Sequence, residues 1–314
     1  MTSAFDVVVL GSANLDLVYT VERIPAPGET VLAGGQARHP GGKGLNQAVA
    51  AARAGARTGF VGALGDDDAA AVLRSVMDDA GIDTSLVRAV AQPTGTALIT
   101  VQADGDNTIV VAAGANATVD HLQPAESAAI TGSRVLVAQL EVPVDVVAEG
   151  AARARWAETT VVLNAAPAQA LDDELLRLVD VLVVNEHEAR VLAAAGPAEG
   201  AQPGAPGDPA DPAIEAATLL DRVGAVVVTL GAEGAVVLTG TADPHRLPAP
   251  SVPVVDTTGA GDTFTGVLAA GLAAGSSLPE AAARAVSAAS LSTQTPGAVP
   301  SIPTAEQVDA QPAR

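Results

Sequence analysis

The stretch Asp256-Thr257-Thr258-Gly259-Ala260-Gly261-Asp262 is the most informative part of this 314-residue sequence. It follows an extended apolar run, 252–255, and leads into a segment of helical character, 263–274, so a strand is expected to turn into a helix here. The first turn of a helix has backbone N–H groups without internal partners, and an anion can bind them where small residues leave the backbone bare. An acid beside such an anion site suits proton abstraction next to a phosphoryl group. Asp262 is therefore the expected catalytic base.

Short valine-rich runs alternate with alanine-rich segments along most of the chain, and this alternation predicts the fold class. Continuous apolar runs of this length suit strands that helices cover on both faces. The pattern predicts an α/β fold with a doubly wound, mostly parallel sheet flanked by helices. One domain over residues 1–314 is expected, because 48% hydrophobic residues are ample for a large core. The expected strands are 6–10, 58–63, 135–139, 160–163, 181–184 and 225–230.

Three regions depart from this alternation. Residues from about 16 to 39 and from 94 to 111 contain alternating segments punctuated by turns. They predict a small antiparallel β-sheet that forms a lid on the α/β body. Residues 196–212 are rich in proline and glycine, which predicts a mobile surface insertion, with a domain linker as the alternative.

Composition narrows the classes of partner. The 16 basic and 36 acidic residues give a net charge of −20, which would repel nucleic acid and anionic membrane surfaces. Aromatic residues make up only 2%, so a stacking platform for single-stranded nucleic acid is not expected. The sequence has no cysteine, no signal-peptide pattern and no uninterrupted apolar run long enough to span a membrane. We expect a soluble cytoplasmic protein.

Several polar residues follow predicted strands, where open parallel sheets bind their ligands. Asn14 and Asp16 suit a polyol, although the same spacing also occurs in simple turns. The segment 41–46 reads Gly-Gly-Lys-Gly-Leu-Asn and lacks the Ser or Thr that a phosphate-binding P-loop has after its lysine. Lys43 and Asn46 are therefore candidates for hydrogen bonds to a sugar. Glu141 could accept hydrogen bonds from hydroxyl groups, or it could be a solvated surface acid.

Other residues later in the chain could serve a nucleotide. Asn185 and Glu188 share one face of a predicted helix, where they could hold hydrated Mg²⁺ or act as an N-cap with a first-turn acid. The segment 229–234 is either a turn between two strands or a loop facing phosphates. A dinucleotide-binding fingerprint is excluded for 259–264, because the last position is Phe264 instead of glycine.

Taken in order, these segments resemble the ribokinase family of PfkB-type carbohydrate kinases. The resemblance runs from about residue 7 to residue 303, and segments 41–46 and 256–262 are similar to the two signatures of that family. A set of ordered matches is more specific than either signature alone. Further matching segments are 11–16, 27–30, 113–116, 139–141 and 164–167.

The resemblance implies an ATP-dependent kinase that phosphorylates D-ribose at O5. Asp262 would take the proton from the 5-hydroxyl, and the amides of Gly259, Ala260 and Gly261 would stabilise charge on the transferred group. Implied sugar contacts are Asn14, Asp16, Gly42, Lys43, Asn46, Glu141 and Asp262. Implied ATP contacts are Asn185, Thr229, Gly231, Gly234 and Gly261, with Mg²⁺ near Asn185 and Glu188.

The resemblance also implies a monovalent-cation site, expected to bind K⁺. Its side-chain ligands would be Asp256 and Ser301, and its carbonyl ligands Thr258 and Gly297. Segment 294–296 departs from the basic residues commonly found before that glycine. A homodimer formed through the lid is expected as well.

Two other functions remain open at this point. The first is a kinase of the same fold that acts on 2-deoxyribose, another pentose or hexose, or a nucleoside. The polar residues expected in the lid disfavour a nucleoside, which needs apolar or aromatic groups against its base. The second is a non-catalytic sugar sensor, which would have no need of both Asp262 and the bare amides before it.

Overall fold

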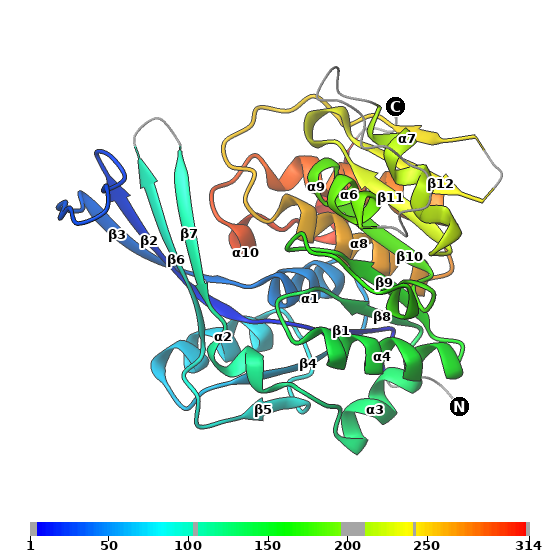
Figure 1. Ribbon diagram of the computed structural model, residues 1–314, viewed down its shortest axis with the longest axis horizontal. Coiled ribbons are helices and arrows are strands. Elements are labelled where there is room, and N and C mark those ends of the chain that lie inside the picture. Colours follow the sequence, from blue (N-terminus) through cyan, green and yellow to red (C-terminus); the bar gives the residue numbers. More distant parts are fainter. Residues whose placement is uncertain (1–4, 103–105, 196–210, 241–242, 312–314) are drawn as a thin grey trace.

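A nine-stranded sheet forms the centre of the molecule, with strand order β13-β12-β11-β10-β9-β8-β1-β4-β5 (Figure 1). The computed structural model describes residues 5–102, 106–195, 211–240 and 243–311. Strands β11 to β5 of this order are parallel, whereas β12 and β13 add antiparallel strands at one edge. The strands are β1 Val7–Leu10, β4 Thr58–Leu64, β5 Val87–Ala89, β8 Val135–Ala138, β9 Thr160–Asn164, β10 Val181–Asn185, β11 Ala225–Thr229, β12 Ala235–Thr239 and β13 His245–Leu247.

Successive residues of one strand enter two separate hydrophobic layers, because side chains alternate across a sheet. Val7 and Val9 of β1 pack into one layer, and Val8 and Leu10 into the other. Burial on both faces explains why the predicted strands are continuous apolar runs, and it confirms the mostly parallel sheet flanked by helices. The first layer is covered by α1 Lys43–Arg53, α2 Asp68–Asp79, α8 Ala260–Ala273 and α9 Leu278–Ser292. The second is covered by α3 Pro124–Thr131, α4 Val144–Trp156, α5 Asp173–Leu176, α6 Glu186–Ala194 and α7 Pro212–Ala217.

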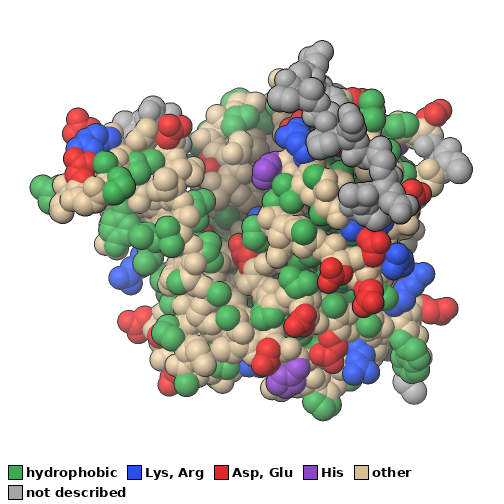
Figure 2. Space-filling model, in the orientation of Figure 1, with side chains coloured by type: hydrophobic (Ala, Val, Ile, Leu, Met, Phe, Trp, Pro, Cys, Tyr) green, Lys and Arg blue, Asp and Glu red, His purple; other side chains and the backbone are tan. Residues whose placement is uncertain are grey.

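A second, four-stranded sheet projects from this body with the order β3-β2-β6-β7 (Figure 1). We call it the small sheet. It consists of two antiparallel pairs, β2 with β3 and β6 with β7, which join through parallel pairing of β2 and β6. Figure 2 shows a hollow between the small sheet and the body. Its strands are β2 Asn14–Val21, β3 Gly35–Gly41, β6 Gly95–Gln102 and β7 Asn107–Ala112.

Two local predictions are wrong. The run 252–255 is not a strand, and Val254 and Val255 are 61% and 60% exposed. The backbone N–H groups of Val255 and Asp256 both donate to the Thr293 carbonyl at 2.8 and 3.0 Å, so they bond to the end of α9 and not to a neighbouring strand. The helix that follows begins at Ala260, three residues earlier than the composition indicates.

Of the predicted insertion, residues 196–210 lie outside the described residues. Pro212 was expected in an irregular segment, but it begins α7. Asp211 caps this helix by accepting a hydrogen bond from the Ala213 N–H at 3.0 Å. Proline is favourable at this first position, because its missing N–H would have no partner inside the helix. Among the described residues, no helix is both long and apolar enough to cross a membrane.

Candidate active site at the carboxyl ends of the strands

The amino terminus of α8 is the centre of the candidate site. Its N-cap, Gly259, has a left-handed φ of 76°, and a Cβ built there would lie 2.8 Å from the Cβ of Ala298. Both observations require glycine at this position. A Cβ added at Gly261 would meet no atom within 4 Å, because that residue faces open space. The first turn of α8 therefore leaves its backbone accessible to an anion.

Asp262 lies in this first turn and is 7% exposed. Its Oδ2 accepts a hydrogen bond from Asn46 Nδ2 at 2.9 Å, and its Oδ1 accepts one from Gln47 Nε2 at 2.9 Å. None of the ion pairs among the described residues involves Asp262. The carboxylate is thus held by neutral amides and is not neutralised in a structural ion pair.

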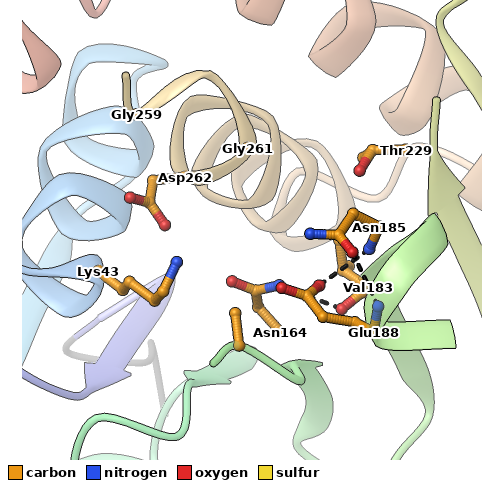
Figure 3. Close-up of a pocket in the computed structure, with 10 residues that line it drawn as sticks. Lys43, Asn164, Val183, Asn185, Glu188, Thr229, Gly259, Gly261 and Asp262 are labelled. Carbon is orange, nitrogen blue, oxygen red and sulfur yellow. Dashed lines mark hydrogen bonds between the residues drawn. The ribbon is translucent and has the colours of Figure 1, made fainter. Parts of the chain in front are cut away.

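A pocket opens in front of Asp262 (Figure 3). Lys43 and Asp262 lie on one side of it, and Asn185 and Glu188 lie on the other. The strands bring these groups together because β9, β10 and β11 all end here. The lining residues are Lys43, Asn164, Ala166, Val183, Asn185, Glu188, Thr229, Gly259, Gly261 and Asp262.

Lys43 is the first residue of α1 and lies among acids. The carboxylate of Asp262 raises the pKa of Lys43, burial lowers it, and Glu141 and Glu188 raise it, with a net shift above its ordinary value. The lysine is therefore charged at neutral pH. A partly buried cation near the Asp262 carboxylate can attract a phosphate despite the acidic composition of the chain.

A second group of polar residues lies beside the pocket and does not line it. Asn14 is 2% exposed, and its Oδ1 accepts a hydrogen bond from Asn116 Nδ2 at 2.8 Å. Asn14 and Asp16 begin β2, so the simple turn is excluded. The carboxylate of Asp16 approaches the backbone of Gly41 so closely that a Cβ there would lie 2.2 Å from Asp16 Oδ2. Burial, together with the nearby carboxylates of Glu141 and Asp262, raises the pKa of Asp16 to about 7.

Glu141 is tied to two other segments and is not a free surface acid. Its Oε2 accepts hydrogen bonds from the Ser12 hydroxyl and from the backbone N–H of Lys43, the latter at 3.0 Å. Gly42, which precedes Lys43, has a φ of 91°, and a Cβ there would lie 2.7 Å from the Asn14 backbone nitrogen. The turn from β3 into α1 therefore packs directly against the start of β2.

The far side of the pocket is built from the N-cap of α6. Asn185 Oδ1 accepts from the Glu188 N–H at 2.8 Å, and Glu188 Oε2 accepts from the Asn185 N–H at 2.9 Å. The N-cap interpretation of these two residues is correct. Burial raises the pKa of Glu188 above its ordinary value despite the hydrogen bond from Asn185.

The predicted nucleotide segment 229–234 divides between the pocket and a turn. Thr229 lines the pocket, and its hydroxyl donates to the Val184 carbonyl at 3.3 Å. Gly231 and Gly234 are not among the lining residues, and they belong to the turn between β11 and β12. A Cβ at Gly234 would lie 2.0 Å from the Leu247 carbonyl oxygen, so packing against β13 explains that glycine.

Three of the four predicted monovalent-cation residues, Asp256, Thr258 and Gly297, are joined by hydrogen bonds to the Asp256 carboxylate. Its Oδ1 accepts from the Thr258 N–H at 2.9 Å, and its Oδ2 accepts from the Gly297 N–H at 2.7 Å. Burial raises the pKa of Asp256, but the hydrogen bonds from Thr258 and Gly297 lower it below its ordinary value. Ser301 is buried in α10 Ala298–Ser301, and its hydroxyl donates to the Ala298 carbonyl at 2.7 Å.

The site also contains residues to which the sequence pattern assigns no role. Gln47 bonds to Asp262, and Asn116 holds Asn14. Asn164 lines the pocket, and Ser12 bonds to Glu141. Each lies in or next to a segment that resembles the family. That position is the only feature of the sequence that could have indicated a place in the site.

Comparison with known proteins agrees with this geometry. A model of the pfkB family carbohydrate kinases matches residues 4–305. The ribokinase of Staphylococcus aureus is 39% identical over 310 residues, which cover 96% of this chain and 98% of that protein. The ribokinase of Haemophilus influenzae is 37% identical over 303 residues, which cover 95% of each protein. The structure of Arabidopsis thaliana ribokinase complexed with ribose and ATP is similar with a TM-score of 0.87, at 32% identity over 97% of each chain. This chain therefore belongs to the pfkB family of carbohydrate kinases.

Proposed function

We propose that this protein transfers the γ-phosphoryl group of ATP to O5 of D-ribose, giving ribose 5-phosphate and ADP. The observation that carries the proposal is the amide-held carboxylate of Asp262 at the open amino terminus of α8, beside Lys43 and the pocket. Similarity to ribokinases over nearly their whole length supports ribose as the acceptor.

The sugar would lie against the polar group beside the pocket. Asn14, Asp16, Asn46 and Glu141 offer amide and carboxylate groups that suit sugar hydroxyls, and Lys43 adds a cation. Gly42 lets the backbone come close. Because Asp262 bonds to Asn46 and also lines the pocket, it would stand between the sugar and the nucleotide.

In this arrangement Asp262 accepts the proton of the 5-hydroxyl while the hydroxyl oxygen bonds to the γ-phosphorus, and ADP leaves. General-base help contributes about 10²- to 10⁴-fold in rate. The amides of Gly259, Ala260 and Gly261 stabilise the charge on the transferred group, and one such donor contributes about 2.7 to 4 kcal/mol. Positioning must supply much of the remainder, and we assign it to closure of the small sheet as a lid.

The nucleotide would occupy the pocket side of Asp262, with contacts from Asn185, Thr229 and Gly261. Gly231 and Gly234 stay predictions for the ATP site, although they lie outside the pocket lining. Mg²⁺ bound with the nucleotide would neutralise phosphate charge. The residues fit an ion held mainly by phosphates and water, since the described residues contain no cluster of three or more His, Cys, Asp or Glu side chains that could hold a metal. Asn185 and Glu188 would hold it through water.

We further propose K⁺ as the monovalent cation, held near Asp256, Thr258, Gly297 and Ser301. The ionised carboxylate of Asp256 and the surrounding backbone turn fit a hard cation. A homodimer through the small sheet and a cytoplasmic location belong to the same proposal.

A screen of purified protein tests the function. With ATP and Mg²⁺, a panel of sugars and nucleosides is assayed with and without K⁺. We expect the highest kcat/KM for D-ribose and a higher rate with K⁺. Preference for a nucleoside or a hexose would contradict the acceptor, and ribose binding without any ATP turnover would identify a sensor.

The control for the screen is Asp262→Asn, which removes the base but keeps the side-chain shape. Its turnover should fall by about 10²-fold or more. ATP binding, measured by calorimetry, should change little, because the pocket keeps its other lining residues. Near-normal turnover of this variant would contradict the role of Asp262 as the base.

A further inference from the structure

Gln47 is a fully buried residue of α1 that the function proposed above does not use. Its Nε2 donates to Asp262 Oδ1 at 2.9 Å and to Asn164 Oδ1 at 3.0 Å. Its Oε1 accepts from Gln139 Nε2 at 2.7 Å. Both amide protons and the amide oxygen are therefore engaged. Flipping the amide would place a donor against a donor and an acceptor against an acceptor, so only one orientation fits.

The partners of Gln47 anchor it to the rigid centre of the fold. Gln139 directly follows β8, and Asn164 ends β9. Asn164 Nδ2 donates in turn to the Val183 carbonyl of β10 at 3.1 Å. Through Gln47, the Asp262 carboxylate on α8 is thus linked to β9, to β10 and to the residue that follows β8, three neighbouring strands of the sheet.

Close contact between α1 and α8 leaves Gln47 little freedom to move. A Cβ added at Gly266 of α8 would lie 2.3 Å from the Gln47 carbonyl oxygen. Only glycine lets the two helices approach this closely. The distance between Gln47 and Asp262 is therefore set by helix packing.

The amide network leaves a buried acceptor without a partner. Gln139 Oε1 is buried without a hydrogen-bond partner, and a Cβ at Gly11 would lie 2.0 Å from it. Leaving such an acceptor unpaired lowers stability. A partly satisfied polar network is less stable than an apolar core, so stability alone does not explain these amides.

We propose that Gln47 is a positioning residue for the phosphoryl transfer, orienting the catalytic carboxylate through Asp262 Oδ1 while Asn46 holds Oδ2. This inference rests on the proposed function. Gln47 touches neither substrate, and it acts only through Asp262. With both carboxylate oxygens anchored, the side chain cannot rotate away from the attacking hydroxyl.

The test uses Gln47→Met, which keeps the length of the side chain and removes its hydrogen bonds. The kcat should fall by about 10²-fold, because a small displacement of a catalytic group has an effect of this size. The KM values for ribose and ATP should stay within about threefold of the wild type. In the Asp262→Asn background, the same substitution should change kcat little, because it acts through the lost carboxylate.

Gln139→Met is the matched comparison, since it alters the same network but leaves the bond between Gln47 and Asp262 in place. We expect its kcat to fall less than that of Gln47→Met, although both variants lose buried hydrogen bonds. If the two variants show similar losses of Tm and equal kcat values, Gln47 is only structural and the proposal is wrong. Equal loss of kcat from Gln47→Met with and without Asp262 would also overturn it.

If Gln47→Met does not fold, Gln47→Leu replaces it, because this variant also removes the hydrogen bond to Asp262 and adds no charge. The same fall in kcat is expected. Wild-type protein is assayed first. Absence of any sugar phosphorylation would overturn the proposed function and this inference together, whereas normal turnover of folded Gln47 variants would overturn the inference alone.

Discussion

The charge of Asp16 should respond to pH near neutrality. Burial is the main cause and the neighbouring carboxylates of Glu141 and Asp262 contribute, and together they raise the pKa of Asp16 to about 7. Near pH 7 the free protein is therefore a mixture of protonated and ionised Asp16. A sugar hydroxyl that donates to this carboxylate would favour the ionised form.

Ribose binding near pH 7 should consequently release protons. The bound form holds fewer protons than the free form, so ribose affinity should rise with pH up to about 7 and level off above it. Calorimetry in buffers of different ionisation enthalpy measures the release. Asp16→Asn should bind ribose more weakly and with a heat that does not depend on the buffer. Equal heats for the wild type in all buffers would contradict the role of Asp16.

Site residues could be predicted from the sequence only where the neighbouring residues form a distinctive motif. Asp262 and Lys43 stand in unusual glycine-rich surroundings, and both are found in the pocket. Gln47 lies within an alanine-rich helix and looks like any polar residue there. The role that we propose for it depends on its contact with Asp262, 215 positions away in sequence, which no local pattern contains.

At the level of elements, the first turn of α8 contains two glycines with different reasons for being small. Gly259 has a left-handed φ and contacts Ala298, whereas Gly261 is helical and faces open space. Gly259 is therefore needed for its backbone conformation, whereas Gly261 is needed to keep the pocket accessible.

Alanine substitutions should distinguish the two glycines. Gly259→Ala should lower stability by about 1 to 2 kcal/mol from the left-handed backbone alone, with an added cost from contact with Ala298. Gly261→Ala should leave Tm unchanged or higher, because alanine favours a helix by about 0.8 to 1 kcal/mol over glycine. Its turnover should still fall, since the methyl group enters the pocket. Thermal melts and steady-state assays check both variants, and equal Tm values would contradict this distinction.

The elements of the central sheet were predicted well because burial on both faces leaves a clear apolar signature. The predicted strands match the structure to within a residue or so at their ends. The short edge strands β5 and β13 carry too few residues for a pattern. The prediction of a strand at 252–255 is wrong for a different reason. Its valines favour a strand, but the segment is not part of either sheet.

For the whole molecule, the small sheet presents an unprotected apolar edge. All six residues of the edge strand β7 are exposed, and Ile109, Val110 and Val111 are 55%, 65% and 50% exposed. Because successive side chains point to opposite faces, apolar groups are exposed on both faces of this strand. An open apolar edge strand favours association, which supports a dimer through the small sheet.

We expect the wild-type protein to sediment as a dimer and Val110→Lys to sediment as a monomer. Ile214→Lys provides the matched control, because Ile214 is 66% exposed on α7 of the body and should leave the dimer intact. Analytical ultracentrifugation measures both. A wild-type monomer at micromolar concentration, or equal effects of the two substitutions, would contradict the dimer.

The start of β2 lies where the small sheet joins the central sheet. Asn14 and Asp16 form the base of the small sheet, yet they lie only a few residues beyond β1 of the central sheet. Asp262, in contrast, is fixed to the body by α8. A pentose bonded to Asp16 and Asp262 together would act as a crosslink between the projecting sheet and the body. The bound sugar would then limit how far the small sheet can move away from the body before the phosphoryl group has been transferred.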